Sequence, residues 1–205
     1  MRELVCRTDN FGEVTWLSHP IWQNVLDLWS LQEAINEVRP ALLIETGTNR
    51  GGSALFYAHL FDLLGEGRVI TVDVERLHQI SHPRIEFLIG SSVAGDVLST
   101  MRDAASAANG PVMVVLDSDH SCGHVTAELA AYHEFVTPGS LLLCQDGIID
   151  ELPLLQDDRP GPLPAIHAFL AEHREFSIDK HYNRRFVVSH HPDGWLRKTA
   201  LSSAR

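Results

Sequence analysis

The sequence contains little cysteine and no long apolar run. Three cysteines occur among 205 residues, Cys6, Cys122 and Cys144. Their odd number and wide spacing exclude a disulfide framework and predict reduced thiols that serve packing. No apolar stretch approaches the roughly 20 residues that a membrane-spanning helix needs, and the first residues lack the apolar region of a signal peptide. We therefore expect a cytoplasmic protein with no membrane partner.

Basic residues are also scarce. The 16 Lys and Arg residues are outnumbered by 27 Asp and Glu residues, which gives a formal net charge of −11. A nucleic-acid binder normally carries a basic excess or a basic patch, and one short basic cluster at 181–186 does not supply it. The composition therefore argues against a nucleic acid as partner.

What the sequence does contain is a series of apolar runs with helical segments between them. Strands are predicted at 41–45, 68–73, 84–90, 112–117 and 140–146. Helices are predicted at 22–39, 53–65, 93–109 and 124–136. Continuously apolar strands are typical of a parallel sheet that helices cover on both faces, so we expect an α/β fold. Two more strand candidates, 176–182 and 185–191, predict an antiparallel hairpin added to the sheet edge.

Two segments flank this core pattern. Residues 147–163 are rich in Pro and Asp and follow a central strand, where ligands of α/β sheets bind, so they predict a lid or substrate loop. Residues 1–40 predict a helical lead-in that packs on the domain formed by 41–205. This lead-in carries Trp16, Trp22 and Trp29, which would seal a subunit interface, cap a pocket or pack on the chain's own sheet. We expect a homo-oligomer.

Acidic residues end four of the predicted strands: Glu45, Asp73, Asp117 and Asp146. In a parallel sheet these ends meet at one edge. Asp73 follows the glycine-rich turn by about one strand–helix–strand unit, where a carboxylate commonly accepts hydrogen bonds from ribose hydroxyls. A helix cap is the alternative role for each of these acids.

The turn ETGTNRGGS at 45–53 lacks both the GxGxxG spacing and the Lys-Ser/Thr pair of a phosphate-binding loop. Gly47 lets the chain turn sharply against a ligand. Glu45 would repel a phosphate but suits a ligand that carries positive charge. S-adenosylmethionine has a sulfonium, an ammonium group and a ribose, and it fits this combination better than NAD or ATP.

Oxygen ligands cluster at the ends of the fourth and fifth predicted strands. Asp117 ends the fourth, and Gln145 and Asp146 end the fifth. Neighbouring strand ends can place three such oxygens around one hard cation such as Mg²⁺, with Asp119 as an additional or substitute ligand. The alternative is a polar cofactor pocket without a metal.

His120 is the candidate general base, three residues after Asp117 and next to Asp119. A histidine can accept the proton of an alcohol while a methyl group arrives. A cap or a structural hydrogen bond is the alternative for His120. His124 is a weaker candidate because it is expected to start the next helix.

The blocks ETGTNRGGS and LDSDHSCGHVTAEL occur together with WLSHP near the start and NRRFVVSHHPDGWLRK near the end. In this combination the chain resembles the family named after cephalosporin hydroxylase and rhamnosyl O-methyltransferase, over roughly residues 15–198. The resemblance implies a Rossmann-like class I methyltransferase that uses S-adenosylmethionine. Its sheet would be mostly parallel and seven-stranded, with helices on both faces and a C-terminal antiparallel hairpin.

The resemblance also implies roles for individual residues. Cofactor contacts would come from Glu45, Gly47, Thr48, Ser53, Asp73, Ser91, Ser92 and Asp117. The Mg²⁺ ligands would be Asp117, Gln145 and Asp146, and the catalytic residues His120, Asp117 and Asp119. Members of the family usually carry Glu where this chain has Gln145. This difference bears on how tightly the chain would bind the metal, and not on its fold.

The implied reaction is methylation of a hydroxyl of a small-molecule acceptor, a sugar or a glycosylated natural product. Two alternatives stay open at this point. One is a nicotinamide-dependent oxidoreductase, against which Glu45 and the missing GxGxxG spacing argue. The other is a non-catalytic cofactor-binding module, which Gln145 favours.

Overall fold

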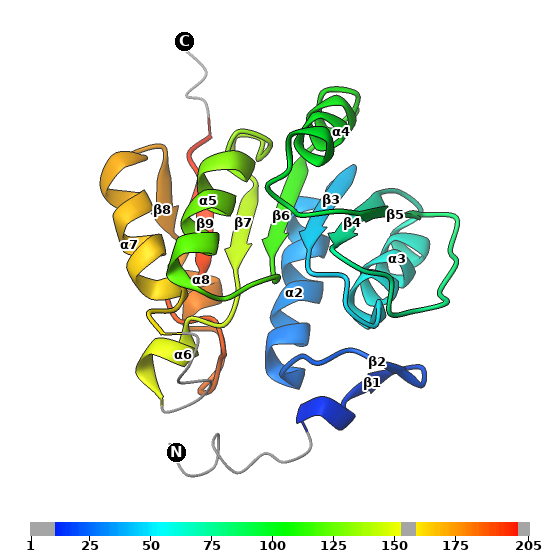
Figure 1. The fold of residues 1–205 in the computed structure, drawn as a ribbon, viewed down its shortest axis with the longest axis horizontal. Coiled ribbons are helices and arrows are strands. Elements are labelled where there is room, and N and C mark those ends of the chain that lie inside the picture. Colours follow the sequence, from blue (N-terminus) through cyan, green and yellow to red (C-terminus); the bar gives the residue numbers. More distant parts are fainter. Residues whose placement is uncertain (1–10, 153–158, 201–205) are drawn as a thin grey trace.

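The computed structural model describes residues 11–152 and 159–200. Its centre is a seven-stranded sheet with the order β5-β4-β3-β6-β7-β9-β8 (Figure 1). The strands are β3 (Leu42–Thr46), β4 (Arg68–Asp73), β5 (Ile85–Ile89), β6 (Val112–Leu116), β7 (Leu141–Cys144), β8 (Phe176–Ile178) and β9 (Trp195–Lys198). Strands β3 to β7 run parallel, and β9 runs antiparallel to both of its neighbours. The expected α/β fold with antiparallel C-terminal strands is confirmed.

One predicted strand is wrong. Residues 185–191 form no strand, and the chain pairs β8 with β9 instead. Asp179 ends the extended chain because its carboxylate accepts hydrogen bonds from the backbone of His181 and Tyr182, which starts the short helix α8 (Lys180–Asn183). Strand β9 then enters between β7 and β8, so β8 rather than β9 forms the edge of the sheet opposite β5.

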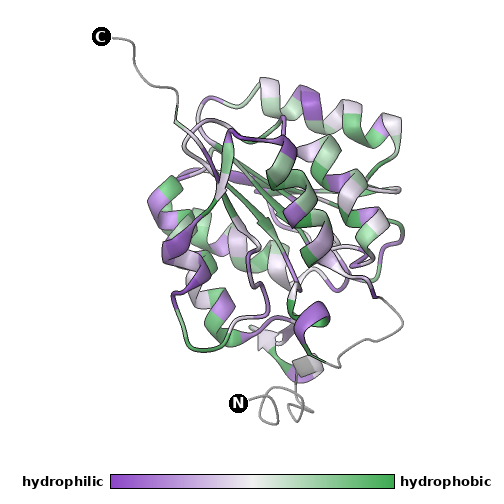
Figure 2. Ribbon diagram, turned by 90° about the vertical axis from the view of Figure 1, so that its left-hand side faces the viewer, coloured by the Kyte–Doolittle hydropathy of each residue, from purple (hydrophilic) through white to green (hydrophobic). Residues whose placement is uncertain are grey.

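The helices form a layer on each face of the sheet. They are α2 (Val25–Val38), α3 (Gly52–Leu64), α4 (Gly95–Ser106), α5 (Cys122–Tyr132) and α7 (Pro162–Glu172). Helices α4, α5 and α7 share one buried cluster with Leu42 and Ile44, and α2 and α3 share the other with Leu43. Alternate residues of one strand thus serve opposite faces, which is why the strands read as continuously apolar. Hydrophobic residues accordingly follow the strands between the helices (Figure 2).

Helices α7 and α8 were not predicted, and neither were several other short elements. These are η1 (Phe11–Glu13), the two-stranded sheet of β1 (Thr15–Trp16) and β2 (His19–Pro20), and α6 (Ile148–Glu151). Helix α6 lies in the proline-rich segment, and the Asp150 carboxylate accepts hydrogen bonds from Gly161 and Leu163 at the start of α7. The lid predicted for 147–163 includes residues 153–158, which lie outside the described residues.

The N-terminal segment reaches the carboxyl edge of the sheet. A Cβ at Gly52 would stand 2.2 Å from the carbonyl oxygen of Pro20, so this glycine lets the segment pack on the start of α3. Asn24 then caps α2 by accepting a hydrogen bond from Leu26. No helix in the described parts of the chain is long and apolar enough to cross a bilayer.

Candidate active site

A cavity of about 830 Å³ opens at the carboxyl edge of the sheet. The loops that follow β3, β4, β5, β6 and β7 line it, together with the N-terminal segment and His190. Ligands of open α/β sheets bind in this position. The volume lies within the range of ligand pockets.

The glycine-rich turn forms one wall of the cavity. Gly47 has φ +85°, and a Cβ there would lie 1.8 Å from the backbone oxygen of Asp117. The Gly47 amide donates to Val72. Only a glycine therefore lets the turn lie this close to the end of β6. Thr48 and Ser53 also line the cavity.

Glu45 lies behind this wall and is not among the residues that line the cavity. Its Oε2 accepts a hydrogen bond from Thr71 Oγ1 at 2.6 Å, and Thr71 Oγ1 in turn contacts Thr48 Oγ1 at 2.6 Å. Burial raises the pKa of Glu45 to about 7, although hydrogen bonds from Ser53 and Thr71 lower it in part. The structure thus places this carboxyl behind the side chains that line the cavity.

Asp73 faces the cavity and is held by backbone amides. Its Oδ2 accepts from Asn49 and its Oδ1 from Val74, each at 2.7 Å. A carboxylate oxygen has more than one acceptor site, so both can still receive ligand hydroxyls. Ser91 and Ser92 line the same cavity, and Ser92 Oγ lies 3.1 Å from His124 Nε2.

Asp117, His120 and Asp146 come together on another part of the wall. His120 Nε2 lies 3.2 Å from Asp146 Oδ2 and 4.0 Å from Asp117 Oδ1. One ligand atom from each residue lies within 4.8 Å of the other two. Burial, followed by the negative charges of Asp146, Glu45 and Glu128, raises the pKa of Asp117 well above its usual range.

This cluster fits a bound cation. Among the described residues, every ion pair of Asp117 and Asp146 is with a histidine. Two adjacent carboxylates without Lys or Arg repel each other in a partly buried site, and a divalent cation would relieve that repulsion. Oxygen ligands with one imidazole are compatible with Mg²⁺ and also with softer divalent ions.

Gln145 joins the cluster through a residue that the sequence reading missed. Gln23 Nε2 donates to Asp117 Oδ2 at 2.8 Å and to Gln145 Oε1 at 2.7 Å. The oxygens of Asp117 and Gln145 therefore converge on one point, at present occupied by the Gln23 amide. Gln145 is buried, and its Nε2 has no hydrogen-bond partner in the described residues.

Loop 184–194 supplies further residues that were missed. The backbone amide of Asp146 donates to His191 Nδ1 at 3.1 Å, and the amide of His190 donates to the buried Asp27 at 2.7 Å. Burial lowers the pKa of His190, which lines the cavity. The adjacent histidines of RFVVSHH were the available signal, but that segment was read as a strand.

Two of the predicted residues stand apart from the cluster. Asp119 is exposed, and its Oδ1 accepts from the Ser121 amide at 2.8 Å, just before α5. His124 is the third residue of α5, and its hydrogen bond with Glu128 raises its pKa. Cys122 packs against the core cluster.

Fold and site together define a class I methyltransferase. The seven-stranded sheet has an antiparallel strand inserted next to its edge, and the carboxylate of Asp73 ends β4 at the cavity, where α/β sheets bind ligands. Carboxylates and a histidine follow β6 and β7 in the same cavity.

Sequence comparison assigns the family. Residues 9–199 match the family described as Rhamnosyl O-methyltransferase/CmcI. The chain is 31% identical over 192 residues to the rhamnosyl O-methyltransferase of Mycobacterium bovis (strain BCG / Pasteur 1173P2), which covers 90% of this chain and 78% of that protein. Identity to the Mycobacterium leprae (strain TN) enzyme of the same name is 32% over 194 residues, 91% of this chain and 83% of that protein. The chain belongs to this family and is an S-adenosylmethionine-dependent O-methyltransferase.

Solved structures agree with the fold. A CmcI structure described with Mg and SAM superposes with a TM-score of 0.73 at 19% identity, over 94% of this chain and 79% of that one. The MycE methyltransferase from the mycinamycin pathway, in complex with Mg, SAH and mycinamycin VI, gives a TM-score of 0.57 at 18% identity, over 98% of this chain and 54% of that one. The family and fold class expected from the sequence are both confirmed.

Proposed function

We propose that this enzyme methylates a hydroxyl group of a sugar or of a glycosylated natural product, with assistance from Mg²⁺. The observation that carries the proposal is the meeting of Asp117, His120 and Asp146 in the cavity that also holds Asp73. Relatives support the acceptor class, because they are named rhamnosyl O-methyltransferases. A MycE structure contains Mg and SAH with mycinamycin VI.

The donor would occupy the part of the cavity near β3 and β4. Asp73 would accept hydrogen bonds from its ribose, and Gly47 allows the backbone to approach closely. Thr48 and Ser53 would contact the methionine end, with Glu45 behind them. Ser91 and Ser92 would border the adenine.

Mg²⁺ would be held by Asp117 and Asp146, with Gln145 as the third ligand. The oxygen of Gln145 accepts from Gln23, so it would have to exchange that hydrogen bond for the cation. When bound, the cation would hold the acceptor hydroxyl and lower its pKa.

His120 would act as the general base. Its Nε2 lies beside Asp146, so this carboxylate can orient the imidazole and stabilise it once protonated. The deprotonated acceptor oxygen would then attack the sulfonium methyl carbon of S-adenosylmethionine, so that an O–CH₃ bond forms as the S–CH₃ bond breaks and S-adenosylhomocysteine leaves. Much of the rate would come from positioning in the cavity. Asp119 also lines the cavity, and it would hold this loop by accepting a hydrogen bond from the Ser121 amide.

The test combines His120→Ala and Asp146→Asn with a panel of hydroxylated sugars and glycosides. We expect methyl transfer to fall by about 10²–10⁴-fold in His120→Ala, while S-adenosylhomocysteine binding by calorimetry is kept. His167→Ala is the matched control, because this exposed histidine also pairs with an aspartate, Asp193, but on another surface. Unchanged transfer in both site variants would refute the base and metal roles.

A further inference from the structure

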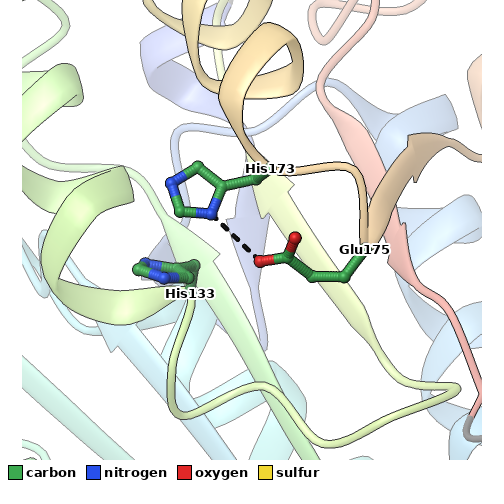
Figure 3. Close-up of side chains that lie close together, drawn as sticks. All are labelled: His133, His173 and Glu175. Carbon is green, nitrogen blue, oxygen red and sulfur yellow. Dashed lines mark hydrogen bonds and ion pairs between the residues drawn. The ribbon is translucent and has the colours of Figure 1, made fainter.

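A second group of possible ligands lies at the opposite edge of the sheet from the cavity. His133 follows α5, His173 follows α7, and Glu175 precedes β8. One ligand atom from each lies within 4.8 Å of the other two. His173 Nδ1 contacts Glu175 Oε1 at 3.0 Å, and the His133 ring lies beside them (Figure 3).

A backbone carbonyl orients the His133 ring. Its Nδ1 lies 3.0 Å from the carbonyl oxygen of Leu129, which can only accept a hydrogen bond. Nδ1 is therefore the donor in this contact, and Nε2 is the ring nitrogen left to bind a metal. A backbone carbonyl that orients one imidazole nitrogen while the other faces a metal is the usual arrangement in metal sites.

Aromatic packing holds both rings in place. His173 stacks on Phe169, with ring centres 4.2 Å apart and planes at 19°. His133 lies 4.3 Å from His173 and meets Phe169 and Phe176 edge-on. The two imidazoles are thus ordered before any ligand arrives, which lowers the entropy cost of binding.

The charges near this site act in opposite directions on a bound cation, because Glu175 attracts it and Lys198 repels it. The carboxylate of Glu175 is exposed, and a hydrogen bond from its own backbone amide, followed by one from His173, lowers its pKa. Lys198 opposes a cation, but its Nζ donates to the carbonyl oxygens of His133 and Val136. The preference of this site for one metal ion over another must therefore come from the imidazole nitrogens of His133 and His173.

We propose that His133, His173 and Glu175 bind a transition-metal dication of the Zn²⁺ type. Two nitrogen ligands and one carboxylate suit Zn²⁺, Co²⁺ or Ni²⁺ and do not suit Mg²⁺. Three protein ligands leave one tetrahedral position for water. The ion would connect the ends of α5 and α7 to the start of β8. This inference does not depend on the proposed function.

The test uses the tag-free full chain, titrated with ZnCl₂ in the presence of excess Mg²⁺, which competes for the active-site cluster of Asp117, His120 and Asp146. Asp146→Asn identifies any Zn²⁺ that still binds there. Calorimetry should show one Zn²⁺ per chain. Glu175→Gln and His173→Asn should each weaken binding by at least about tenfold. Zn²⁺ should raise the melting temperature of the unaltered chain and not that of these variants.

Two matched variants identify the site. His167→Ala removes an exposed histidine of α7 outside the cluster and should bind Zn²⁺ normally. Asp146→Asn alters the active-site cluster and should also bind normally. Unchanged affinity in both Glu175→Gln and His173→Asn refutes the proposal, as does loss of Zn²⁺ binding in Asp146→Asn alone. Glu175 is 44% exposed, so Glu175→Gln tests the ligand without disturbing the core.

Discussion

At the scale of single residues, Gln145 shows how this chain differs from the expected pattern of its family. A third carboxylate at this buried position would add negative charge next to Asp117, whose ionisation burial already opposes. The amide avoids that cost, and Gln23 connects it to Asp117 through one shared nitrogen. The Gln145 amide is neutral and attracts a cation less than a carboxylate would. We therefore expect it to lower the affinity for the metal.

We therefore expect Gln145→Glu to bind Mg²⁺ about tenfold more tightly, because affinity rises with the charge of the ligands. Calorimetry with S-adenosylhomocysteine present measures this. Gln145→Met, which keeps the shape but removes the oxygen, is the control and should bind more weakly than the unaltered chain. Equal affinities in all three proteins would show that position 145 is not a ligand.

Glu45 should make stability depend on pH. Burial raises its pKa from 4.5 to about 7, so the folded chain keeps a proton that the unfolded chain loses between these values. The stabilisation is complete below about pH 4.5 and disappears as pH rises through 7, a change of about 3 kcal/mol.

Glu45→Gln is always neutral, so its stability relative to the unaltered chain should rise between pH 5 and pH 8 (values bracketing the pKa of about 7). Urea unfolding at each pH gives the difference. Glu66→Gln, at a half-exposed ion pair with Arg39, is the control and should show little change. A pH-independent difference for Glu45→Gln would mean that this carboxyl is ionised throughout.

At the scale of elements, the sequence predicts those helices and strands whose conformation depends on their own residues. Strands such as β3 and β6 are buried on both faces and were found from their apolar runs. The segment 185–191 contains the apolar run 186–188, yet Val187 is 82% exposed. A contact from Asp27 to His190 holds that segment as a loop, and nothing within the segment itself indicates it.

The residues of the site also fall into a predictable group and an unpredictable one. The convergence of Asp73, Asp117 and Asp146 on one cavity follows from strand ends meeting at one edge, so it was predictable. Gln23 and His190 come from segments outside the parallel core. Their positions depend on how those segments pack, which the spacing of residues does not encode.

The turn between β3 and α3 should tolerate no side chain at Gly47. We expect Gly47→Ala to lose about 3 kcal/mol of stability, because its φ is +85° and the new Cβ would meet the Asp117 backbone. Gly95→Ala is the control, since a Cβ in this helical position meets nothing within 4 Å. Denaturant unfolding compares them, and equal losses would contradict the steric argument.

At the scale of the whole molecule, an apolar surface stands out around the start of α2. Trp22 lies just before α2, Val25, Leu26 and Trp29 lie in its first two turns, and all four are exposed. Trp22 also lines the cavity. Exposed apolar residues that gather in this way mark contact sites more often than isolated ones do.

We expect this surface to mediate self-association, which is one of the three roles that the sequence left open for its tryptophans. The double variant Val25→Ser with Trp29→Ser should shift the chain towards the monomer in sedimentation velocity runs over a concentration series. Leu63→Ser is the control, because Leu63 is 85% exposed on α3. The interface would be refuted if the unaltered chain were a monomer. It would also be refuted if the double variant showed the same association as an oligomeric unaltered chain.

The insertion of β9 between β7 and β8 has a consequence for synthesis on the ribosome. Strand β8 is made before β9, yet β9 is its sole ladder partner within the described sheet. When residues 176–178 leave the ribosome they have no strand to join, and the edge of β7 is also unpaired until residues 195–198 follow. Folding of this half of the sheet must therefore wait, and a nascent chain stalled before Trp195 would expose strand edges that chaperones and aggregating chains recognise.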